Sequence, residues 1–97
     1  MDRGQSLIIP FLFDGTNYAH WKVRMKAFLQ SLDEKVWQAV EIGWTKPKEA
    51  PADWDVAKIK AANFNNRALN ALFSAVINEE FKKISSTETA QEAWTIL

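Results

Sequence analysis

The residues that could carry out acid–base chemistry in this chain are one histidine and a few pairs of carboxylates. His20 is the only histidine, and its neighbours Ala19 and Trp21 provide neither a nucleophile nor an acid to orient it. None of the carboxylate pairs has the inward-facing setting that separates the pKa values of an acid and a base. We therefore expect that the protein is not an enzyme. The pairs fall at expected helix starts and in turns, where capping and the helix dipole account for them: Asp33 with Glu34, Asp53 with Asp55, and Glu79 with Glu80.

Few residues are suited to hold a cofactor or a metal. The chain has no cysteine, which excludes disulfides, thiol catalysis and zinc sites built on thiolates. Gly4, Gly15 and Gly43 are too far apart in the sequence to form a glycine-rich phosphate loop. We expect no cofactor and no bound metal.

Charge is balanced over the 97 residues, with 12 basic and 12 acidic side chains and a net charge of zero. Binding to a nucleic acid or an anionic membrane requires a cationic face, and the balanced charge of this chain does not predict one. Low net charge instead favours self-association. We expect the partner to be a second copy of this chain or another protein, with no direct binding of nucleic acid or membrane by this segment.

An apolar segment, residues 7–13, follows a polar tail, residues 1–6, that we expect to be mobile. The segment is too short to span a bilayer and is a poor signal peptide, so we expect a cytoplasmic protein. Because Pro10 favours extended geometry, the segment is predicted to be an arm that packs on its own domain or contacts a neighbouring molecule. Four of its side chains are candidate interaction residues: Ile8, Ile9, Phe11 and Phe13.

Helical spacing of apolar residues begins directly after this arm. Gly15 allows a turn with a positive φ, and Asn17 is the expected N-cap of a helix over residues 18–32. A second helix is expected to follow at once, with Asp33 as its N-cap and Gly43 as its stop.

The second half of the chain predicts a loop and then three more helices. Two prolines make residues 43–53 the clearest loop, and Asp53 is expected to cap a long helix that reaches about Ile77. An asparagine cluster inside this helix leaves a bend there as the alternative. A short helix is expected over residues 78–84. The last helix starts near Thr87 or Thr89, where a capping box is possible.

These elements predict one all-α domain over residues 7–97, a small orthogonal or irregular bundle of four or five helices with an extended N-terminal arm. Because the last helix stops in mid-pattern, we expect the chain to be a fragment of a longer one. Trp44 and Trp54 flank the proline-containing loop and either close it over the core or supply exposed contacts, so both are candidate interaction residues. The expected core consists of Trp21, Met25, Phe28, Leu29, Trp37, Val40, Leu69, Leu72, Phe73, Val76, Trp94 and Leu97.

Three stretches, in this order and spacing, resemble the capsid region of the Gag polyprotein of plant Ty1/copia-type LTR retrotransposons. The first is residues 15–18 (Gly-Thr-Asn-Tyr) followed by Trp21, and the second is residues 36–40 (Val-Trp-Gln-Ala-Val). The third is residues 89–97, which is similar to a T-A-x-E-x-W-x-x-L helix of those polyproteins. Between them, residues 68–72 (Ala-Leu-Asn-Ala-Leu) resemble the family's central helix.

This resemblance implies a non-enzymatic, self-assembling domain, equivalent to most or all of the N-terminal lobe of a two-lobed, all-helical capsid protein. The second lobe and the zinc knuckle that grips RNA in that family are absent from this sequence, which fits the neutral charge and the lack of cysteine. The alternative is a domesticated, Gag-like host module that binds a partner protein or peptide in an apolar groove.

Overall fold

The computed structural model describes residues 12–97, and in this range the chain is all-α, as predicted. Its one β-type contact is an isolated parallel bridge between Phe13 and Val76. The N-terminal tail and the candidate contacts Ile8, Ile9 and Phe11 lie outside the described residues. The helices are α1 (Tyr18–Leu32), α2 (Glu34–Glu41), α3 (Val56–Ser74), α4 (Asn78–Ile84) and α5 (Ala90–Ile96), with a 3₁₀ helix at Pro51–Asp53 before α3.

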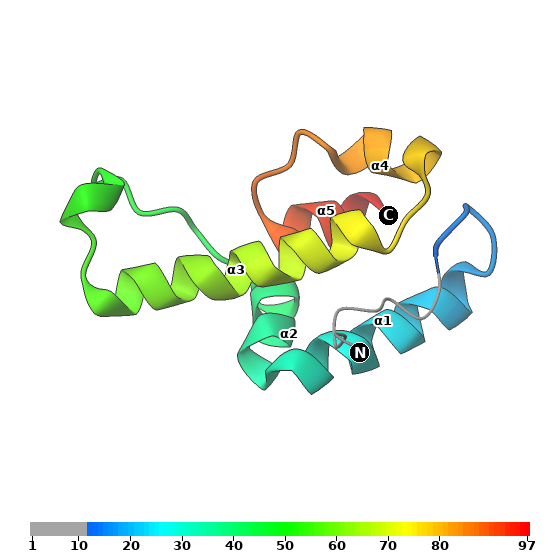
Figure 1. Cartoon of the computed structure of the whole chain (residues 1–97), viewed down its shortest axis with the longest axis horizontal. Coiled ribbons are helices and arrows are strands. Elements are labelled where there is room, and N and C mark those ends of the chain that lie inside the picture. The colour runs from blue at the N-terminus through cyan, green and yellow to red at the C-terminus, as the bar shows by residue number, and fades with distance from the viewer. Residues whose placement is uncertain (1–11) are drawn as a thin grey trace, which may run out of the picture.

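The helices are arranged around α3, the longest of them, in a flat molecule of 41 × 33 × 20 Å. As Figure 1 shows, α1 and α2 lie to one side of α3, and α4 and α5 lie to the other. α2 packs against α1, α3 and α5, so it links the two sides. The N-terminal half of α3 extends beyond this packed body together with the segment that precedes it (Figure 1).

The start of α1 differs from the prediction, although its boundaries agree. Gly15 has the expected positive φ, of 95°. Asn17, however, makes no side-chain cap, because its own backbone is left-handed with φ at 53°, a conformation that asparagine tolerates well. The turn is stabilised instead by Asp14, whose Oδ1 accepts bonds from the Thr16 backbone N–H and hydroxyl at 2.9 and 2.6 Å. Asn17 as a side-chain cap was therefore a wrong prediction.

The ends of α2 follow from the residues expected there. Asp33 accepts a hydrogen bond from the Lys35 backbone N–H at 2.8 Å, as an N-cap should. Gly43 has φ at 96°, and a Cβ at this position would collide with the side-chain amide of Gln91 on α5. Glycine is therefore needed here for the left-handed backbone, whereas the end of the flexible Gln91 side chain can move away from an added Cβ.

The start and end of α3 correct two predictions. Asp53 is not its cap, because Pro51 initiates a 3₁₀ turn that ends at Asp53. Asp55 caps the helix instead and accepts from the Lys58 backbone N–H at 2.8 Å. The helix also ends at Ser74, short of Ile77, because the chain beyond it pairs with Phe13. Between these ends α3 is a single helix.

Aromatic rings from four parts of the chain meet in the core. Phe13 stacks on Trp21 with centroids 4.9 Å apart, and Trp21 stacks on Trp94 at 5.8 Å. Trp37 meets Trp94 edge-on at 5.5 Å. The structure places seven of the expected core residues in the buried cluster, namely Trp21, Met25, Leu29, Trp37, Val40, Leu72 and Val76. The other five are partly buried against it: Phe28, Leu69, Phe73, Trp94 and Leu97.

Asn65 is the most deeply buried of the polar residues that the structure describes, and its side chain joins α3 to the start of α5. It is fully buried, with 0% of its surface exposed. Its Oδ1 accepts from the Ala90 backbone N–H at 2.9 Å, and its Nδ2 donates to the Glu88 carbonyl at 3.0 Å. The Ala90 N–H is one of the N–H groups that a helix start leaves without an intrahelical partner. The residue that we expected to weaken α3 therefore holds α5 in place.

Asn65→Ala should destabilise the protein by about 1–3 kcal/mol, because it leaves the buried Ala90 N–H and Glu88 carbonyl without partners. Asn63→Ala is the matched control, since Asn63 is exposed on the same helix and gains the same helix propensity. Urea unfolding followed by circular dichroism measures both variants. Equal unfolding midpoints for the two variants would contradict the bridging role.

Candidate protein-interaction surface

The segment between α2 and α3 forms, together with the first turns of α3, an end that projects from the packed body (Figure 1). We call residues 42–61 the projecting end. The buried residues of α3 begin only at Ala62, so the helix is covered by the body along its later part alone. The surface of the projecting end therefore faces solvent.

Local contacts hold the projecting end in shape. The Trp54 indole N–H donates to the Glu49 carbonyl at 3.0 Å. The Glu49 carboxylate forms an ion pair and hydrogen bond with Lys58 on α3. Trp54 thus closes its own loop and is half-buried, but it is not part of the core cluster, so it does not close the loop over the core as the first of its two expected roles required.

Large apolar side chains are exposed on this end of the molecule. Val56 is 68% exposed, Ile59 is 44% exposed and Ile42 is 71% exposed. Trp44 is half-buried and forms a wall of two shallow grooves, one toward α2 and one toward Trp54. Val56 and Ile59 lie three residues apart on one face of α3, and neighbouring apolar side chains that remain uncovered are typical of surfaces that bind other proteins.

Phe13 corrects the prediction for the apolar arm. It was a candidate interaction residue, but it is 4% exposed and belongs to the core. Its backbone N–H donates to the Ala75 carbonyl at 2.8 Å, and its carbonyl accepts from the Ile77 N–H at 3.0 Å. Phe13 therefore packs on its own domain and does not contribute to an exposed contact surface.

Val56 and Ile59 were not among the predicted contact residues. A signal for them exists in the sequence, because both fall outside the inward stripe that runs through Phe64, Ala68 and Leu72. An aliphatic residue away from such a stripe is either exposed or covered by another element. Only the fold shows that the described residues leave these two uncovered.

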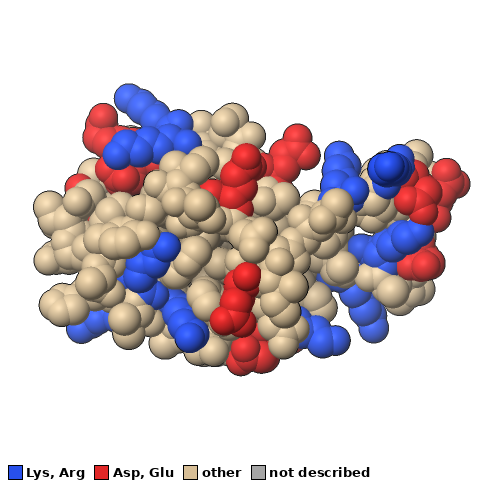
Figure 2. Space-filling model, turned by 180° about the vertical axis from the view of Figure 1, so that it is seen from behind, with Lys and Arg blue, Asp and Glu red and all other residues tan. Residues whose placement is uncertain are grey.

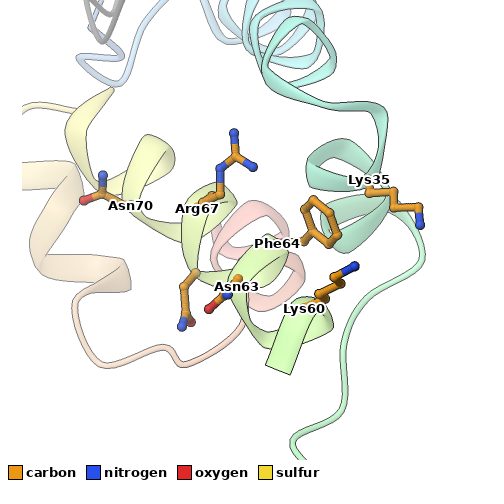
Figure 3. Close-up of a pocket in the computed structure, with 7 residues that line it drawn as sticks. Lys35, Lys60, Asn63, Phe64, Arg67 and Asn70 are labelled. Carbon is orange, nitrogen blue, oxygen red and sulfur yellow. The ribbon is translucent and has the colours of Figure 1, made fainter. Parts of the chain in front are cut away.

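A groove runs along the boundary between α2 and α3, with a volume of about 580 Å³ (Figure 3). Lys35 of α2 and Phe64 of α3 face each other across it. An adjoining groove of about 420 Å³ shares these two residues and continues to Ile42 and Trp44. The full lining of the first groove is Lys35, Lys60, Asn63, Phe64, Asn66, Arg67 and Asn70.

Charges of both signs are interspersed over the face seen in Figure 2, which is otherwise dominated by uncharged residues. The hydrogen bond from Lys58 lowers the pKa of Glu49 below its ordinary 4.5, and the same bond raises the pKa of Lys58 above 10.5. Hydrogen bonds from Thr16 lower the pKa of Asp14.

The described residues contain no group of three or more His, Cys, Asp or Glu side chains that could hold a metal ion. His20 is exposed on α1, and its side chain makes no hydrogen bond or ion pair within residues 12–97. Among the helices of the described range, none is long and apolar enough to cross a bilayer.

Residues 13–41 match a family model described as a domain of unknown function (DUF4219). The chain is thus a small all-α protein containing a DUF4219 domain. The matched residues are Phe13, the turn that follows it, α1 and α2, whereas α3, α4 and α5 lie outside the match. No curated protein and no solved structure matches the chain.

The ion pair of the projecting end should persist from mildly acidic to alkaline pH. A carboxylate whose pKa is lowered contributes stability above its ordinary pKa, and that contribution is lost as the pH falls through the lowered value. Because the pKa of Lys58 is raised, the ion pair is lost on the alkaline side only above pH 10.5. Lys58→Met should therefore shift the pKa of Glu49 upward toward 4.5, as measured by NMR titration of its carboxyl carbon.

Lys48→Met is the control for this titration, because Lys48 is next to Glu49 in sequence but has no ion pair among the described residues. It removes the same charge and should leave the pKa of Glu49 nearly unchanged. Equal shifts in the two variants would show that general charge, and not the Lys58 contact, controls Glu49.

Proposed function

We propose that this chain is a non-enzymatic, cytoplasmic module that acts by binding protein, and that it self-associates in the manner of the N-terminal capsid lobe of a copia-type Gag protein. The observation that carries the proposal is the apolar surface of the projecting end. Val56 and Ile59 are exposed there, in the first turns of α3, on a part of the molecule that extends away from the body. Covering such side chains is the main favourable contribution to protein association.

Composition supports self-association in particular. The net charge of zero means that two copies approach without long-range repulsion. The projecting end also carries both signs, since Lys46, Lys48 and Lys58 lie among Glu49, Asp53 and Asp55. Two copies can therefore pair charges of opposite sign around an apolar centre.

The family match supports the proposal only through the residues that it covers. It covers the Gly-Thr-Asn-Tyr turn and the Val-Trp-Gln-Ala-Val helix, two of the stretches that resemble copia-type Gag proteins. The description of that family names no function. Assembly into a shell is accordingly part of the proposal and rests on the resemblance.

The proposed contact is weak for a single pair of molecules. The apolar side chains involved are few, and many identical copies in an assembly supply avidity. We expect a dissociation constant on the order of 100 µM, which corresponds to about −5.5 kcal/mol.

Light scattering coupled to size exclusion, over a range of loading concentrations, tests self-association. The average mass should rise above the 11.1 kDa of the monomer as concentration increases. The double variant Val56→Asp/Ile59→Asp should remain at the monomer mass. These positions lie in the first turns of α3, where added negative charge favours the helix dipole, so folding should be retained.

Val23→Asp is the matched control. Val23 is 70% exposed but lies on α1, away from the projecting end, so the added charge should not alter the association. If the wild-type chain stays at the monomer mass over the whole range, self-association is refuted, and the domesticated host module becomes the better interpretation. If Val23→Asp abolishes association as completely as the double variant, the projecting end is not the contact surface.

A further inference from the structure

The exposed face of α3 is cationic and rich in amides. Over its 19 residues, α3 contains two lysines, one arginine and four asparagines but no acidic residue. Lys60, Asn63, Arg67 and Asn70 follow one another at spacings of three, four and three residues, so they line one face of the helix. All four are exposed.

Lys35 of α2 completes a cationic groove opposite this face. The groove has a volume of about 580 Å³, and Figure 3 shows Lys35, Lys60 and Arg67 around the ring of Phe64. No aspartate or glutamate lines it. It therefore carries three formal positive charges on a chain whose net charge is zero.

These three cations have no carboxylate partner within residues 12–97. Lys58 and Lys83, by contrast, are paired with Glu49 and Glu80. The Lys35 ammonium lies over the Phe64 ring, whose centroid is 5.9 Å from Nζ. The groove thus presents cations that are available to a carboxylate from outside.

The groove is apolar where it continues toward the projecting end. The adjoining groove of about 420 Å³ shares Lys35, Lys60 and Phe64 and extends to Ile42 and Trp44. A ligand that lies along both grooves contacts cationic side chains at one end and, at the other end, a surface suited to a bulky apolar side chain.

We propose that this composite groove binds an acidic peptide segment of a partner protein, in which two or more carboxylates lie next to a bulky apolar residue. The proposal rests on the protein-binding function above and names the ligand class of a second surface. The carboxylates pair with Lys35, Lys60 and Arg67, and the apolar side chain packs on Phe64, Ile42 and Trp44.

The asparagines suit a peptide, and the scarcity of aromatic rings disfavours a nucleic acid. A side-chain amide both donates and accepts hydrogen bonds, as does a peptide backbone. Asn63, Asn66 and Asn70 can therefore use both of their polar atoms on a peptide. Binding of single strands also relies on aromatic rings on which successive bases stack, and Phe64 is the one ring in the charged groove.

The test is fluorescence anisotropy with labelled 12-residue peptides that contain Asp and Glu beside Leu-Phe in four different spacings. For each, a peptide with Lys in place of the acids and a U-rich RNA of equal charge serve as comparisons. At least one acidic peptide should bind with a dissociation constant below about 1 mM, more tightly than its lysine counterpart and the RNA. Binding should weaken as salt is added.

Arg67→Glu should weaken this binding by roughly tenfold or more, because it replaces a pairing cation by a repelling charge. Lys48→Glu is the matched control, since it makes the same change of charge at an exposed residue that lines neither groove. Circular dichroism confirms that both variants fold. Amide shifts of residues 60–70, followed by NMR during the titration, place the bound peptide on α3.

Three results would overturn the proposal: no acidic peptide binding more tightly than its lysine counterpart, tighter binding of the RNA, or equal weakening by Lys48→Glu and Arg67→Glu.

The double variant Val56→Asp/Ile59→Asp separates this site from self-association, because neither residue lines the composite groove. A chain that stays monomeric but binds the peptide refutes the first proposal alone. A chain that associates but binds no acidic peptide refutes the second alone.

Discussion

The carbonyl of Ala75 is the point on which the rest of the fold depends. It accepts two hydrogen bonds, one from the Phe13 backbone N–H at 2.8 Å and one from the Trp21 indole at 3.2 Å. Trp21 in turn lies between the rings of Phe13 and Trp94. One buried acceptor thus ties the segment before α1, α1 itself and the end of α3 together, and the stacked rings extend the connection to α5. A buried carbonyl without a donor would be costly, so each of these parts stabilises the others.

This arrangement also explains where the exposed apolar surface lies. The connections at Ala75 and Asn65 both involve the later part of α3, and α2 and α5 pack there. The first turns of α3 have no covering element among the described residues. The loop before α3 is shaped by its own contacts, with Trp54 and Lys58 both bound to Glu49. The body and the projecting end are thus stabilised by different interactions, so the projecting end can be varied without disturbing the core.

Local signals predicted the helices well but their caps less reliably. Residues 18–32 and 78–84 are helical as the apolar spacing indicated, and Thr89 accepts the expected hydrogen bond from the Glu92 N–H at 3.1 Å. Asp53 failed as a cap because Asp55 took that role, and Asn17 failed because its own backbone is left-handed and its side chain accepts no capping bond. Several polar residues near a helix start are similarly suited to cap it, and the backbone conformation of the turn decides among them.

The sequence by itself determined the all-α class, because the period of its apolar residues depends only on the geometry of the helix. It also determined which side chains favour burial, since that follows from their transfer from water. Only the tertiary structure decided that Asn65 is buried and bridges α3 to α5, that Phe13 packs on its own domain, and that Lys35 faces Phe64. Each of these depends on a partner distant in the chain, and the sequence pattern around a residue does not contain the position of such a partner. The cationic groove between α2 and α3 arises for the same reason, because its charges come from two helices and meet only after folding.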